Sequence, residues 1–137
     1  MHTFIGSKLV TAIPMTQGHF TAYLGSEFPG YSAPTAPGYM IEDPRGVTNH
    51  ADHVGKLSWM PALNFTAEYL DLGTIQNEPP HVQRLLGELA QLEQKLNALK
   101  AFFKSDLFLK LPFDSRDLLQ EQSRIMSRYA AILEERI

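Results

Sequence analysis

The clearest hydrophobic pattern lies in the last two-fifths of the chain. Apolar residues recur there at alternating spacings of three and four, which is the repeat of one face of an α-helix. The row comprises Val82, Leu85, Leu89, Leu92, Leu96, Leu99 and Phe103. A second and wider apolar row follows, with Leu118, Leu119, Ile125, Met126, Tyr129, Ile132 and Leu133. Two such helices with a short connection predict an antiparallel αα-hairpin.

The connection between these helices is itself apolar, since it contains Leu107, Phe108 and Leu111. Such residues are too apolar for a solvated loop, so we expect them to cover the end of the hairpin. The second helix is expected to begin within the stretch FDSRDLL. Asp114 or Ser115 would cap it by accepting hydrogen bonds from the free N–H groups of the first turn.

The first half of the chain has a different pattern, because eight of the nine glycines and all prolines but one lie at or before Pro80. Such frequent interruption is typical of short strands and loops. We expect strands at 8–15, 38–42 and 54–59, a short helix at 17–24 capped by Thr16, and a helical turn or two after Pro61. DPRG at 43–46 predicts a tight turn, and three prolines and three glycines in 25–38 predict an irregular loop.

These patterns together predict an α+β protein. A small N-terminal module with a β-hairpin and short helices would span residues 1–77, and the helical hairpin would span 78–137. The boundary follows from NEPP at 77–80, because a residue before proline avoids the helical region whereas proline itself suits a first helical turn.

Composition narrows the class of protein further. There is no cysteine, which excludes disulfides and thiolate metal sites, and the net charge is −3. Neither half carries the clustered Lys and Arg that long nucleic acid requires. We find no signal peptide and no run approaching the ~20 apolar residues of a membrane span. We therefore expect a cytoplasmic protein with no membrane or long nucleic acid partner.

The stretch TNHADHVGKLSW is the strongest candidate for polar chemistry, because His50 and His53 flank Asp52. It could be a metal site, a general base or a pH-sensitive contact. The preferred interpretation is a loop in which Asn49 and Asp52 cap turns and both histidines are solvated. No nucleophile elbow, Walker motif or dinucleotide fingerprint is present, so we expect no enzyme, no metal and no cofactor.

Two features favour binding. Arg124 and Arg128 are four residues apart on the second helix and Arg84 lies at the start of the first, and guanidinium groups suit phosphates. The alternative is a solvated basic face. Aromatic residues of the first half, with Tyr39 and Trp59 as candidates for ligand contact, could stack on a base or form the core.

The leucine row also favours self-association, because two helices alone do not bury so much apolar surface. The expected self-association residues are Leu85, Leu89, Leu92, Leu96, Phe103 and Met126. The alternative is that this row is only the internal seam of one hairpin.

The N-terminal half resembles small proteins of tailed phages and prophages. The matching positions are Lys8, Val10, Ala12, Pro14, Met15, Thr16, Gly38, Tyr39, Gly46, Ser58, Trp59, Pro61, Phe65 and Tyr69. The chain departs from that pattern at Arg45, Met60, Thr66 and Glu68.

The C-terminal half resembles the helical hairpin of phage anti-CBASS and anti-Thoeris proteins, including relatives from crAss-like phages. Its opening matches at Pro80, His81, Gln83, Arg84, Glu88, Leu92, Lys95 and Leu96. Its end matches at Leu118, Leu119, Gln122, Met126, Tyr129, Ile132, Leu133, Arg136 and Ile137.

The resemblance implies a sponge, a protein that binds a cyclic nucleotide immune signal without cleaving it. The signal would be a cyclic ADP-ribose of the Thoeris type or a CBASS cyclic oligonucleotide. The resemblance also implies a hexamer-like homo-oligomer built through the hairpins, with Arg84, Arg124 and Arg128 as phosphate contacts. The alternatives are a direct protein inhibitor of a defence protein, a self-associating phage assembly component, and a metal enzyme around His50 and His53.

Overall fold

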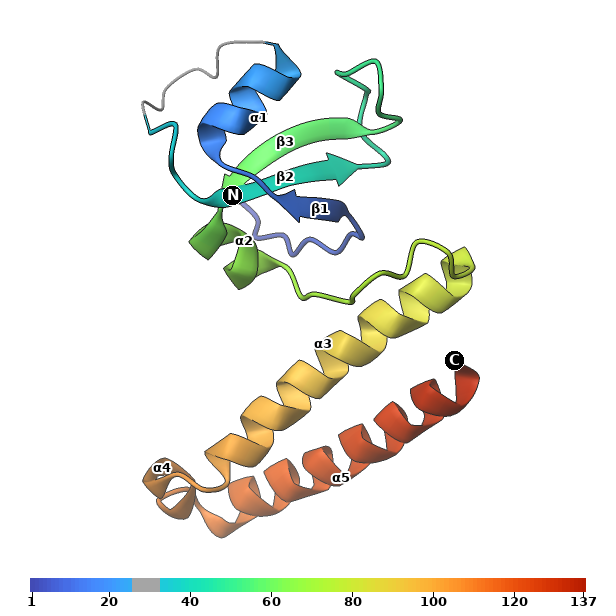
Figure 1. The fold of residues 1–137 in the computed structure, drawn as a ribbon. Helices are drawn as coiled ribbons and strands as arrows, with labels where there is room; N and C mark the ends of the chain where they lie inside the picture. Colours follow the sequence, from blue (N-terminus) through green and yellow to red (C-terminus); the bar gives the residue numbers. More distant parts are fainter. Residues whose placement is uncertain (26–32) are drawn as a thin grey trace. The chain divides into compact units, whose positions relative to one another are not determined.

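The computed structural model describes residues 1–25 and 33–137, which form two compact units, Met1–Tyr69 and Leu70–Ile137 (Figure 1). In the described chain, the first unit has a three-stranded antiparallel sheet and short helices, and the second has a pair of long helices. The fold is therefore α+β, as the sequence predicts. Part of the loop expected at 25–38 lies outside the described residues.

The sheet has the order β1-β2-β3, and its strands are β1 (Thr11–Pro14), β2 (Gly38–Asp43) and β3 (Lys56–Pro61). The Asp43 carbonyl accepts a hydrogen bond from the Gly46 N–H at 3.1 Å, which closes the predicted DPRG turn. The register places Met40 opposite Trp59 and Glu42 opposite Leu57. Because side chains alternate along a strand, these four residues share one face of the sheet.

Helix α1 (Gln17–Leu24) covers that face. Its N-cap is Thr16, as predicted, and the Thr16 hydroxyl accepts a hydrogen bond from the His19 N–H at 3.3 Å. Phe20 projects from α1 and packs with Met40 and Leu57 in a core where each side chain is at most 7% exposed. The sheet thus fixes α1 through apolar packing, and the last turn of α1 lies at the edge of this core.

Helix α2 (Ala62–Glu68) begins directly after Pro61, as expected. The N-terminal module also depends on Gly38, because a Cβ added there would lie 2.2 Å from Cζ2 of Trp59. Any larger residue at position 38 would displace the indole ring.

The second unit consists of α3 (Pro80–Phe102), α4 (Asp106–Leu109) and α5 (Phe113–Arg136). Helices α3 and α5 pack together and run antiparallel, as the two apolar rows predict (Figure 1). The buried side chains of the pair are Leu85, Leu96, Ala130 and Leu133. In the part of the chain that the structure describes, no helix has the length and apolar character needed to cross a membrane.

The connection between the long helices is partly as expected. Phe108 is 6% exposed and its ring lies 4.9 Å from that of Phe103, so it does cover the end of the hairpin, whereas Leu107 is exposed. The expected N-cap of α5 is wrong. The helix begins at Phe113 after Pro112, with no side-chain cap, so Asp114 already lies in its first turn.

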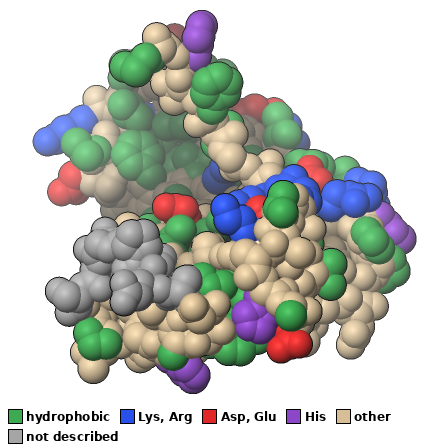
Figure 2. All heavy atoms as spheres, turned by 90° about the horizontal axis from the view of Figure 1, so that it is seen from above, with side chains coloured by type: hydrophobic (Ala, Val, Ile, Leu, Met, Phe, Trp, Pro, Cys, Tyr) green, Lys and Arg blue, Asp and Glu red, His purple; other side chains and the backbone are tan. Residues whose placement is uncertain are grey.

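The wide apolar row of α5 divides into two faces. Leu133 is fully buried against α3, but another group of apolar side chains is between 38% and 69% exposed, namely Leu118, Ile125, Tyr129 and Ile132. Exposed apolar side chains are also visible over the face shown in Figure 2 (green). The hairpin itself therefore leaves one apolar face of α5 uncovered.

Burial of Leu57 predicts a large loss of stability on truncation. Leu57→Ala should lower the free energy of unfolding by about 2–4 kcal/mol, because it leaves a cavity beside Phe20 and Met40. The matched control is Leu63→Ala on α2, since Leu63 is 85% exposed and should change stability by less than about 0.5 kcal/mol. Chemical denaturation measures both. Equal losses would contradict this description of the core.

Candidate functional site

The three arginines predicted to contact phosphates are exposed on the hairpin, but their surroundings differ. Arg124 is paired with Glu121 through two contacts, from Nε to Oε2 at 3.0 Å and from Nη2 to Oε1 at 2.5 Å. The pair raises the pKa of Arg124 and lowers that of Glu121, mainly through the side-chain hydrogen bond. Among the described residues, neither Arg84 nor Arg128 forms an ion pair. These two are therefore better placed than Arg124 to accept an anion.

A hydrogen bond between the two long helices sets the relative level of these arginines. The Tyr129 hydroxyl donates to the Glu88 carboxylate, which raises the pKa of Tyr129. Arg84 is one helical turn before Glu88 on α3, and Arg128 precedes Tyr129 on α5. Arg124 lies a further turn, about 5 Å, toward the α4 end of the hairpin. Arg84 and Arg128 thus lie on opposite sides of this contact, roughly 7–8 Å apart along the helix pair.

The two predicted aromatic contacts, Tyr39 and Trp59, lie in the other unit and already have partners. The Trp59 indole N–H donates to the Met15 carbonyl at 2.7 Å. Tyr39 stacks on Phe65 with ring centroids 4.2 Å apart, and Phe65 stacks on Tyr69 at 5.0 Å. Both rings therefore contribute to packing of the N-terminal module, and the structure divides the predicted ligand set between two units.

The predicted self-association residues lie along the hairpin. Leu85 and Leu96 are buried, and the others are partly buried, namely Leu89, Leu92, Phe103 and Met126. Within one chain, this row packs the pair of helices.

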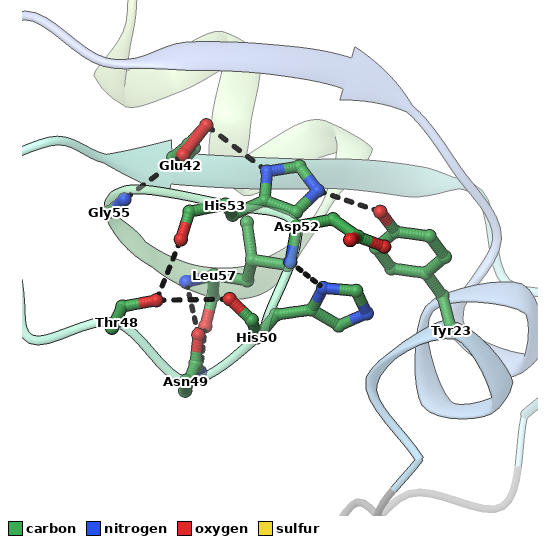
Figure 3. A network of polar contacts seen from close by, with 9 residues as sticks. All are labelled: Tyr23, Glu42, Thr48, Asn49, His50, Asp52, His53, Gly55 and Leu57. Carbon is green, nitrogen blue, oxygen red and sulfur yellow. Dashed lines mark hydrogen bonds and ion pairs between the residues drawn. The ribbon is translucent and has the colours of Figure 1, made fainter.

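The most extensive polar network of the N-terminal module surrounds the two histidines (Figure 3). His53 Nε2 lies 2.7 Å from the Tyr23 hydroxyl, and His53 Nδ1 lies 3.2 Å from Glu42 Oε2. The Gly55 N–H donates to Glu42 Oε1 at 3.1 Å. His50 stacks on Tyr23 with ring centroids 4.6 Å apart and an interplanar angle of 6°. The network thus joins the end of α1, strand β2 and the loop before β3.

The expected solvated loop is wrong for His53, whose side chain is only 20% exposed and engages both ring nitrogens. The expected turn caps also differ. Asn49 pairs with the backbone of Leu57, and Asp52 bonds through its N–H to His50 Nδ1 at 3.1 Å. Within residues 1–25 and 33–137, no group of three or more acidic or histidine side chains could hold a metal ion.

The carboxyl group of Glu42 is held as an anion. The Gly55 N–H and His53 both favour its charged form, so its pKa lies below the ordinary value of 4.5. A carboxylate only accepts hydrogen bonds, so His53 must donate from Nδ1. In the neutral ring Nε2 then carries the lone pair, and the Tyr23 hydroxyl donates to it.

Sequence reasoning missed Tyr23 and Glu42, which complete this network. Glu42 could have been found from strand alternation, because it lies two residues after Met40 and so faces α1. Tyr23 gives no comparable signal, since its position depends on how α1 docks on the sheet.

Comparison with models of protein families gives a match in the hairpin. Residues 79–137 match the model of a protein family described as Sequestin. This match fits the resemblance of the hairpin to phage sponge proteins. No curated protein and no solved structure matches the chain.

Glu42 predicts a specific pH dependence of stability. Its pKa is lowered in the folded state, so the unfolded chain binds more protons on this carboxyl as the pH falls. The stabilisation is present above pH 4.5 and is lost as the pH falls through the folded pKa. Glu42→Gln should therefore lower Tm at pH 6–7, and the difference from the parent should shrink at acidic pH. Glu68→Gln, at an exposed position on α2, is the control. A difference that stayed constant with pH would contradict this role.

Proposed function

We propose that the chain sequesters a cyclic nucleotide immune signal and leaves it chemically intact. The observation that carries the proposal is the match of residues 79–137 to a family whose name, Sequestin, denotes sequestration. The resemblance of the same residues to phage anti-Thoeris and anti-CBASS hairpins supports it. The ligand would be a cyclic ADP-ribose or a cyclic oligonucleotide, and both carry phosphate groups.

Phosphate recognition is the step that the hairpin supports best. An exposed arginine without an ion pair can turn its planar guanidinium group to a phosphate without first losing a partner. Arg84 and Arg128 satisfy this condition among the described residues. Arg124 must exchange its contacts with Glu121 for contacts with the ligand, which reduces its net contribution.

The arginines yield a graded prediction for binding. Arg84→Ala and Arg128→Ala should each weaken binding of the signal by roughly 10- to 100-fold, because each removes a charge-assisted hydrogen bond. Arg124→Ala should have a smaller effect. Lys100→Ala, which removes one positive charge from α3, should bind within about twofold of the parent. Titration calorimetry with cyclic ADP-ribose and cyclic trinucleotides measures all four.

The chemical state of the nucleotide released from the protein distinguishes a sponge from other functions. The purified protein is incubated with each cyclic nucleotide and denatured by heat, and the released small molecules are analysed by mass spectrometry. Recovery of the intact nucleotide supports sequestration, and a cleaved nucleotide overturns it. Absence of binding to any cyclic nucleotide also overturns it, and then favours direct inhibition of a defence protein or an assembly role.

We also propose that the chain forms homo-oligomers through the uncovered face of α5. Its four apolar side chains, Leu118, Ile125, Tyr129 and Ile132, lie on one side of the helix at spacings of seven, four and three. A continuous apolar face of this kind is more often covered by a partner than left in water. A second copy supplies the same face, as an isologous interface requires.

A charge test distinguishes this face from the rest of α5. Ile125→Glu with Ile132→Glu should reduce the mass measured by light scattering to that of a monomer, because two carboxylates would be buried in the interface. The control is Gln120→Glu with Ser127→Glu, which adds the same two charges on the opposite side of α5. Retention of the oligomer by the first variant, or its loss in the second, would contradict the assignment.

A further inference from the structure

The hydrogen-bonded series around His53 has the geometry of an activated nucleophile. A hydroxyl, an imidazole and a carboxylate lie in sequence, with the Tyr23 oxygen 2.7 Å from Nε2 and Glu42 Oε2 3.2 Å from Nδ1 (Figure 3). In such a series the imidazole removes the proton of the hydroxyl as it attacks, and the carboxylate stabilises the imidazolium that results. Nothing in the proposed function of the hairpin uses these residues.

The Glu42 carboxylate determines which atom donates in each hydrogen bond of the series. Its carboxylate is fixed by the Gly55 N–H at 3.1 Å and can only accept from His53. The lone pair of neutral His53 therefore faces the Tyr23 hydroxyl. Proton transfer from Tyr23 would give the His53 ring a positive charge. The adjacent Glu42 carboxylate would stabilise that charge.

Tyr23 is both held in place and accessible. His50 stacks on its ring at 4.6 Å, and the His50 ring is itself fixed by the hydrogen bond from the Asp52 N–H. Tyr23 is nonetheless 37% exposed. A reagent in solution can thus reach the phenol without unfolding of α1.

Tyr129 provides an internal contrast. Its hydroxyl also donates to a neighbour, but the acceptor is the Glu88 carboxylate, which raises the pKa of Tyr129 because it opposes a phenolate. The same chain therefore holds one tyrosine beside a base and one beside an anion.

We propose that Tyr23 is a base-assisted nucleophile and a covalent modification site for activated phosphoryl or sulfonyl groups. The phenol oxygen forms a bond to phosphorus or sulfur, and the bond to the leaving group breaks with its electron pair. The phenol proton passes to His53 Nε2, and Glu42 acts as a positioning residue through His53. An aryl sulfonyl fluoride, which releases fluoride, is the probe.

The test compares the labelling rates of individual tyrosines in the full-length protein. It is treated with an aryl sulfonyl fluoride, and the labelled residues are quantified by peptide mass spectrometry over time. Tyr23 should be labelled at least about tenfold faster in the parent than in the His53→Gln variant, in keeping with the usual effect of a positioned base. Equal rates for Tyr23 in the two proteins would overturn the proposal.

Variants separate the base from a structural role. His53→Gln keeps a polar side chain but cannot take the proton, so labelling of Tyr23 should fall by at least about tenfold. His53→Ala should be slow alone and recover when imidazole is added, which a purely structural role does not predict. His19→Gln is the control, since the exposed His19 side chain lies on the same helix and forms no hydrogen bond with Tyr23 or His53 in the described structure, and labelling should stay within about twofold.

Two variants of Glu42 test its role as a positioning residue. Glu42→Gln should slow labelling of Tyr23 and Glu42→Asp should restore part of it, because only the latter keeps the charge next to the imidazolium. Unchanged labelling in His53→Gln, or no recovery of His53→Ala with imidazole, would overturn the assignment of His53 as the base. An equal loss of labelling in His19→Gln would do the same.

Discussion

The side chain of Asn49 pairs with the backbone of Leu57 as a neighbouring strand would, accepting from its N–H at 2.8 Å and donating to its carbonyl at 2.9 Å. Leu57 is 2% exposed, so this pairing anchors a polar loop to the buried core of the module. The Thr48 hydroxyl then binds the carbonyls of His50 and His53, at 3.1 and 2.8 Å. The positions of both imidazoles, and hence the contacts with Tyr23 and Glu42, depend on these backbone anchors.

Local rules were sufficient for much of the fold. The Thr16 cap, the DPRG turn and the heptad row of α3 each depend on residues a few positions apart, and all were predicted correctly. The network around His53 was not predicted, because its partners lie 30 and 11 positions away in sequence. Such distant contacts depend on sheet register and on the docking of α1. Of the residues in this network, only Glu42 could have been predicted, from the alternation of side chains along the strand.

The N-cap of α5 was predicted wrongly because the helix begins after a proline, and α2 and α3 begin in the same way. All three helices begin directly after a proline in extended conformation, Pro61, Pro79 or Pro112, with ψ between 145° and 151° and no side-chain cap. Proline fixes φ near the helical value and lacks an N–H that would need a partner. A proline could therefore set these boundaries before Asp114 or Ser115 was reached. The sequence rule for side-chain caps applies to α1 and α4, where a Thr or Ser precedes the helix.

The two units differ in how completely their polar and aromatic groups are already satisfied, and this difference decides where a ligand could bind at low cost. A base that stacked on Tyr39 or Trp59 would compete with the Phe65 ring or with the bond to Met15. A phosphate at Arg84 or Arg128 displaces only water, since these arginines form no ion pair within the described residues. Every favourable interaction that a ligand must first displace reduces the net free energy of binding, so exposed cations without a partner are the more favourable starting point. Tyr39 and Trp59 instead contribute to packing of the N-terminal module, and the Tyr23 hydroxyl of the same module is positioned by neighbours that the fold itself supplies.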